Sequence, residues 1–209
     1  MADRVGSQVM GAIWRGHVPG RSGEVFLVPR PGDFVAVSKD ACGVVGGAPK
    51  ADTAHPMPWA SIARVPFVVY GPGYAEAGRT VYEPSDFTSL APTYARLLRF
   101  DDFKADGAPL SAISPGPRAP KVIVTVVLDG GGWNTLQLHP GAWPEISGLI
   151  RDGTSFANAT TGSAPSITGA IHATMGTGRY PVASGIPGNQ MRGPGGDVVD
   201  TWLDTSTRA

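Results

Sequence analysis

Asp129 is the residue whose setting most suggests chemistry. It directly follows a β-branched run at 121–128, which predicts a buried strand, and glycines occupy 130–132 after it. A carboxylate at the carboxyl edge of a parallel sheet faces a ligand crevice, and glycines let backbone and ligand approach closely. We interpret Asp129 as a candidate metal ligand. Two alternatives stay open. One is an Asp that begins a turn, and the other is a nucleotide-binding glycine loop, whose Gly-x-Gly-x-x-Gly spacing fails because position 135 is Thr.

Thr168 and Ser166 are the candidate nucleophiles. The pattern predicts a short helix over 168–175, so Thr168 stands at a helix N-terminus, where amide groups and the dipole favour an anion. The alternative is that Thr168 only caps this helix. A serine-type esterase using Ser166 is conceivable, although no Gly-x-Ser-x-Gly elbow is present. His172 lies four residues after Thr168, and we interpret it as packed or bonded to a backbone carbonyl.

His55 is the other candidate ligand. It lies in a predicted loop at 40–58, just before a predicted buried strand at 65–70, where a His can hold a metal or merely cap. Phosphate-ester hydrolysis needs cations beside the nonbridging oxygens and an in-line nucleophile. A bound zinc would activate a Thr hydroxyl as it activates water. Together Asp129 and Thr168 look like half of a metal-dependent phosphoryl-transfer site, and His55 stays open between a ligand and a capping group.

The secondary structure that must position these residues can be predicted from hydrophobic periodicity and from the Gly and Pro residues that end helices and strands. The patterns predict helices within 1–20, at 84–98 with a break near Pro92, at 143–150 and at 168–175. They predict strands at 23–29, 33–38, 65–70, 121–128 and 153–157, a linker at 100–120 and irregular chain at 181–209. Ser85 is the expected N-cap of the helix at 84–98.

Composition excludes several classes of protein. The 209 residues are 42% hydrophobic, with 17 basic and 17 acidic side chains, which argues against a binder of nucleic acid. A single cysteine, Cys42, excludes an intrachain disulfide. No apolar run reaches the roughly 18 residues of a membrane span, and the N-terminus lacks a signal-peptide pattern. A cytoplasmic location is expected only if Met1 is the true N-terminus, and the oligomeric state stays open.

Four motifs, in this order, resemble the alkaline phosphatase superfamily, especially its type I phosphodiesterase/nucleotide pyrophosphatase branch. They are Leu128-Asp129-Gly130, Pro165-Ser-Ile-Thr168, Thr177-Gly-Arg-Tyr-Pro181 and Gly185-Ile-Pro-Gly-Asn189. In addition, Ala51-Asp-Thr-Ala-His55 is similar to the element that carries the last metal histidine, with Pro56 in place of Gly.

The resemblance implies a role for each candidate. Asp129, Thr168 and His55 would contact zinc, and Thr168 would be the nucleophile that becomes phosphorylated. Asn189 would donate to a phosphoryl oxygen, and the Gly169 amide would bind another. The complete family site holds two Zn²⁺ and acts on a small phosphate mono- or diester. Position 171 is Ile where the phosphodiesterase branch has Asn, so the substrate class stays open.

The resemblance also implies a fold. We expect an α/β three-layer sandwich, present in part, with a mostly parallel central sheet and helices on both faces. Residues 1–110 resemble the C-terminal part of the family domain, 111–120 a Pro-rich join, and 121–209 the nucleophile-bearing N-terminal part. This order indicates a circular permutation within one composite domain. The family's further Asp and His ligands have no counterpart after Asn189. We therefore expect a zinc-dependent phosphohydrolase, with an incomplete or non-catalytic member that binds an anion or partner as the alternative.

Overall fold

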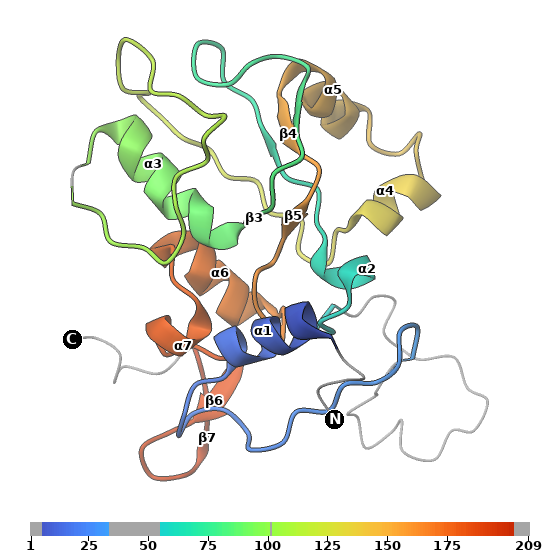
Figure 1. Ribbon diagram of the computed structural model, residues 1–209, viewed down its shortest axis with the longest axis vertical. Coiled ribbons are helices and arrows are strands. Elements are labelled where there is room, and N and C mark those ends of the chain that lie inside the picture. The colour runs from blue at the N-terminus through green and yellow to red at the C-terminus, as the bar shows by residue number, and fades with distance from the viewer. Residues whose placement is uncertain (1–5, 34–54, 101, 203–209) are drawn as a thin grey trace.

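The computed structural model describes residues 6–33, 55–100 and 102–202, which form a mixed α/β fold (Figure 1). The helices are α1 (Ser7–Gly16), α2 (Ala60–Ala63), the 3-10 helix η2 (Phe87–Ser89), α3 (Leu90–Leu98), α4 (Trp133–Leu138), α5 (Pro144–Asp152), α6 (Thr168–Thr177) and α7 (Pro181–Ser184). The strands are β1 (Val68–Val69), β2 (Arg79–Val81), β3 (Ser85–Asp86), β4 (Thr154–Phe156), β5 (Ala159–Thr160), β6 (Gln190–Arg192) and β7 (Val198–Asp200).

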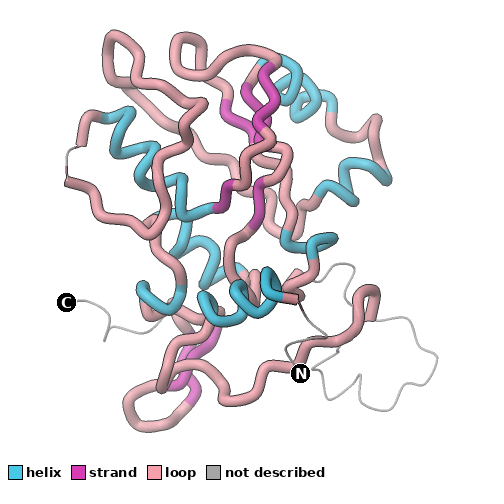
Figure 2. Tube along the Cα trace, viewed as in Figure 1, coloured by secondary structure: helices cyan, strands magenta, loops and turns pink. Residues whose placement is uncertain are grey.

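These strands build small sheets, and loops make up much of the chain (Figure 2). β4 is the central strand of the largest sheet, antiparallel to β1 and parallel to β2. β3 and β5 pair in parallel, and β6 and β7 form an antiparallel hairpin. The described residues do not show the mostly parallel central sheet that the family resemblance implies.

The prediction of a buried strand at 121–128 is wrong. The segment has no regular secondary structure and pairs with no strand among the described residues, and all of its residues except Ile123 are exposed. Val124 and Val126 are each 78% exposed, whereas Ile123 packs against the core and Thr125 shares a 2.8 Å hydrogen bond with Tyr94. β-branched residues favour an extended backbone, but a ladder also needs a neighbouring strand.

The other strand predictions had mixed outcomes. The chain at 23–29 is mostly exposed and forms no strand, so that strand prediction is also wrong. The strand at 65–70 is confirmed over Val68–Val69, and that at 153–157 as β4. The predicted strand at 33–38 lies, apart from Asp33, outside the described residues, as does most of the loop at 40–58.

The helix predictions hold better, because caps and apolar spacing are local signals. α1, α5 and α6 confirm three of them. The helix at 84–98 begins as η2 and continues as α3, with Pro92 in the first turn of α3, where a missing amide proton costs little. The cap is Asp86 rather than Ser85, because the Asp86 carboxylate accepts the Thr88 amide at 3.0 Å.

The core joins residues from both halves of the chain. It contains Phe67, Val81, Leu90, Leu97, Leu110, Ala112, Ile113, Phe156, Ala159, Ile171 and Met175. Leu110 and Ile113 belong to the predicted linker, so that segment is packed rather than free. The Arg96 guanidinium holds it by donating to the carbonyls of both residues.

One side of the fold holds α6 between α3 and α7, with α1 against α7 (Figure 1). The predicted irregular chain at 181–209 contains α7 and the β6–β7 hairpin. Their few residues, rich in glycine and proline, give no recognisable period, although Gly185 ends α7 in the left-handed conformation.

Candidate functional site

The structure brings Asp129 and Thr168 together. Ile167 is extended, with φ −113° and ψ 159°, and α6 begins at the next residue, so Thr168 stands at the helix mouth. Its hydroxyl donates to Asp129 Oδ2 at 2.8 Å. The 121–128 segment is not a strand, yet it delivers the carboxylate to the place that the sequence predicts.

His55 joins this pair on the other oxygen of the carboxylate. Its Nε2 lies 3.3 Å from Asp129 Oδ1, and its Nδ1 lies 2.7 Å from the carbonyl oxygen of Ser166. The side chains of His55 and Asp129 are 35% and 43% exposed, so solvent and a ligand can reach both. One imidazole, one carboxylate and one hydroxyl therefore converge at the N-terminus of α6.

Asn189 reaches the same helix end from the turn after α7. Its Oδ1 accepts the Gly169 amide at 2.7 Å, which leaves the Asn189 Nδ2 group as a donor. The close approach needs glycine, because a Cβ at Gly169 would lie 2.5 Å from the Gly188 carbonyl oxygen. The amide of Gly169, expected to bind a phosphoryl oxygen, is thus already bonded to a side chain.

The other two candidates near Thr168, Ser166 and His172, both make hydrogen bonds to backbone carbonyls. Ser166 is 4% exposed and donates its hydroxyl proton to the carbonyl of His55, so it does not face solvent as a nucleophile would. His172 Nδ1 bonds the Thr168 carbonyl at 2.9 Å, which confirms the interpretation that it pairs with backbone. The Ser166–His55 contact is a part of the site that sequence reasoning missed. No local signal relates two residues so far apart along the chain.

Hydrogen bonds also fix the chain just before and just after α6. The Tyr180 hydroxyl donates to Asp86 Oδ2 at 2.6 Å, and the Arg15 guanidinium lies 5.0 Å from the centre of the Tyr180 ring. Arg15 Nε bonds the Gly162 carbonyl at 2.6 Å, at the start of the segment that leads to Thr168. Burial, and then the hydrogen bond to Asp86, raise the pKa of Tyr180 to about 12.

The donor atoms suit a zinc ion in kind and in spacing. Zinc takes imidazole nitrogen and carboxylate oxygen at about 2.0–2.2 Å, which sets two ligand atoms of a tetrahedral site roughly 3.4 Å apart. His55 Nε2 and Asp129 Oδ1 are separated by 3.3 Å. Within residues 6–33, 55–100 and 102–202, no group of three or more His, Cys, Asp or Glu side chains is gathered to hold a metal. The fit is therefore to part of a ligand set.

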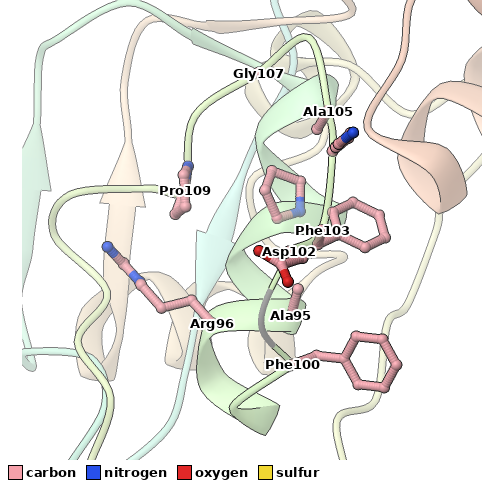
Figure 3. A pocket seen from close by; sticks show the side chains of 10 residues that line it. Ala95, Arg96, Phe100, Asp102, Phe103, Ala105, Gly107 and Pro109 are labelled. Atoms are coloured by element: carbon pink, nitrogen blue, oxygen red, sulfur yellow. The ribbon is translucent and has the colours of Figure 1, made fainter.

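The hollow shown in Figure 3 lies elsewhere, between α3 and the chain that follows it. It measures about 630 Å³ and is lined by Arg96, Phe100, Asp102, Phe103 and neighbours, none of which is a candidate site residue. A smaller hollow of about 200 Å³ includes Ile167 and Gly188 in its lining, together with residues of α1 and the chain after it. The chemistry of the candidate site is therefore carried by converging side chains at an open surface.

Comparison with known proteins gives one match. Residues 123–209 match the family model of type I phosphodiesterase / nucleotide pyrophosphatase, a range that contains Asp129, Thr168 and Asn189. No curated protein and no solved structure matches the chain. In the part of the chain that the structure describes, no helix has the length and apolar character to cross a membrane.

Proposed function

We propose, from the premise that residues 123–209 belong to the type I phosphodiesterase / nucleotide pyrophosphatase family, that this site hydrolyses a small phosphate mono- or diester through a phosphorylated Thr168. The family supports hydrolysis of phosphoesters in general. The observation that supports the finer assignment is the 2.8 Å hydrogen bond from the Thr168 hydroxyl to Asp129.

Each residue has a role that its contacts support. In the proposed reaction the Thr168 oxygen attacks phosphorus while the bond to the leaving oxygen breaks, and Asp129 Oδ2, which accepts the Thr168 hydroxyl at 2.8 Å, receives the hydroxyl proton. Asn189 Nδ2 donates to a nonbridging oxygen, since Asn189 Oδ1 is occupied by Gly169. The N-terminus of α6 adds partial positive charge beside that oxygen. Water then cleaves the phosphothreonine and releases phosphate or its monoester.

His55 and Asp129 would hold a zinc ion in this proposal. When bound, zinc supplies a Lewis acid that lowers the pKa of an attached hydroxyl and offsets negative charge on the substrate. His55 Nε2 and Asp129 Oδ1 are the two atoms that face each other for this purpose. Two zinc ions are expected in the complete family site.

The test compares Thr168→Ala with the conservative Thr168→Ser. Turnover of an aryl phosphate and of a bis-aryl phosphate is measured with and without added Zn²⁺. Loss of a hydrolase nucleophile costs on the order of 10⁶ in kcat, so we expect Thr168→Ala to lose activity by at least about 10³-fold. Thr168→Ser should retain part of it, and acid quenching followed by mass spectrometry should find phosphate on residue 168. Equal rates for wild type and Thr168→Ala would remove the nucleophile assignment.

A second candidate is a site that binds a phosphate-like anion without turnover. The observation that favours it is the partial ligand set: His55 and Asp129 meet, but no group of three or more His, Cys, Asp or Glu side chains is gathered among the described residues. In that case wild type would bind inorganic phosphate, measured by calorimetry, but release no aryl alcohol in excess zinc. Dialysed protein would then retain fewer than two zinc ions per chain.

A further inference from the structure

We propose that Ser166 is a positioning residue that fixes the imidazole of His55 with Nε2 directed at Asp129. The inference rests on the proposed function, in which His55 is a ligand. It concerns a group that the phosphoryl transfer does not use, since the Ser166 hydroxyl is buried and faces away from solvent.

The first step concerns which nitrogen of His55 carries a proton. A carbonyl oxygen can only accept, so the 2.7 Å contact between His55 Nδ1 and the Ser166 carbonyl requires a proton on Nδ1. A neutral imidazole has one ring proton, so its Nε2 presents a lone pair. That lone pair is the group a divalent metal binds.

The second step concerns how the ring is held. The Ser166 hydroxyl donates to the His55 carbonyl while the Ser166 carbonyl accepts from the His55 ring. The two hydrogen bonds run between the same two residues, one fixing the backbone of His55 and the other fixing its ring. Rotation of the ring would break the second bond, and displacement of the His55 backbone would break the first.

The third step links the ligand to the nucleophile. Ser166 lies two residues before Thr168, and the extended Ile167 between them directs Thr168 toward Asp129. The same short segment therefore places both the hydroxyl and the imidazole against one carboxylate. In the neutral ring, His55 Nε2 and Asp129 Oδ1 are both acceptors at 3.3 Å, an arrangement that favours a cation between them.

The experiment determines which ring nitrogen of His55 carries the proton, by nitrogen-15 NMR of protein with labelled histidine. The spectra are recorded at about pH 8, above the ordinary histidine pKa of about 6.5. The His55 signals are assigned with a His55→Gln variant. Wild type should show His55 with its proton on Nδ1. Ser166→Ala should show a mixture of the two tautomers, and its affinity for Zn²⁺ alone should fall about 10- to 100-fold, the range for loss of a group that orients a metal ligand.

Ser163→Ala is the matched control. Ser163 is another buried serine of the same segment, but its hydroxyl has no hydrogen-bond partner in the described part of the chain. This variant should keep the wild-type tautomer and zinc affinity. Ser166→Thr keeps the hydroxyl and should restore both.

The proposal is overturned if wild-type His55 carries its proton on Nε2, a reading that does not depend on any variant folding. It is also overturned if Ser166→Ala keeps the tautomer and zinc affinity of Ser163→Ala. Failure of the proposed function has a different signature. The Nδ1–H tautomer and the loss of zinc binding in Ser166→Ala would both be observed, with no phosphoester turnover by wild type.

Discussion

Two segments meet at the candidate site, and they are built in opposite ways. The segment 161–180, which contains α6, is largely buried and is held by hydrogen bonds near both ends, at Gly162 and at Tyr180. The segment 121–129 lies on the surface, with Ile123 and Thr125 as its contacts to the rest of the fold. The comparison shows that Thr168 is positioned by packing and hydrogen bonds, whereas Asp129 is positioned by a few side chains and by Thr168 and His55 themselves.

The largest effect is expected on the buried side of this comparison. Gly169→Ala places a Cβ 2.5 Å from a backbone carbonyl oxygen, so α6 must move away from Asn189. We expect the free energy of unfolding to fall by about 1–3 kcal/mol, the usual cost of overpacking, with loss of hydrolysis. Urea denaturation gives the first value and aryl phosphate turnover the second.

Gly176→Ala is the control in the same helix. A Cβ there meets nothing within 4 Å, and alanine favours a helix over glycine by roughly 1 kcal/mol. This variant should be as stable as wild type or more so. Equal losses in the two variants would mean that the close approach of Gly169 to Gly188 does not hold the site.

A smaller effect tests the exposed segment. Ile123→Ala removes the side chain that packs on the core and should cost about 1–2 kcal/mol, below the 2–5 kcal/mol of a fully buried aliphatic residue. Val124→Ala changes a side chain that is 78% exposed and should stay within about 0.5 kcal/mol of wild type. Thermal and urea unfolding of the two variants measure the difference. Equal costs would show that both faces of 121–128 are covered, as in the strand predicted from sequence.

The smallest effect concerns the alkaline stability of the buried segment. The pKa of Tyr180 is raised to about 12, so the folded protein keeps this proton where the unfolded chain, with an ordinary tyrosine pKa near 10, has lost it. The contribution of the protonated Tyr180 hydroxyl to the free energy of unfolding is therefore complete below about pH 10, and it is lost as the pH rises toward 12. The stability difference between wild type and Tyr180→Phe should shrink over this range, and the variant should lack a tyrosine absorbance change near pH 12. A difference that grew with pH would contradict the assignment.

Local patterns predict several of the helices, and the candidate residues Asp129 and Thr168 do come together in the structure. The spacing of apolar residues, together with the Gly and Pro residues at the ends, is enough to predict α5 and α6. The β-branched run before Asp129 is enough to make that carboxylate a candidate. The sheet was not predictable in the same way, because pairing depends on residues far along the chain. The 121–128 run has the composition of a buried strand but has no neighbour among the described residues. The Ser166–His55 pair was missed for the same reason.

The place of β4 has a consequence for how the protein is made. Its two neighbours, β1 and β2, both come from the first half of the chain and bind it from opposite sides. On a ribosome these two strands emerge well before the strand that separates them. In the nascent chain, Phe67 and Val81 therefore stay exposed until Phe156, which packs with them in the core, has been synthesised. During that interval chaperone binding or aggregation competes with folding.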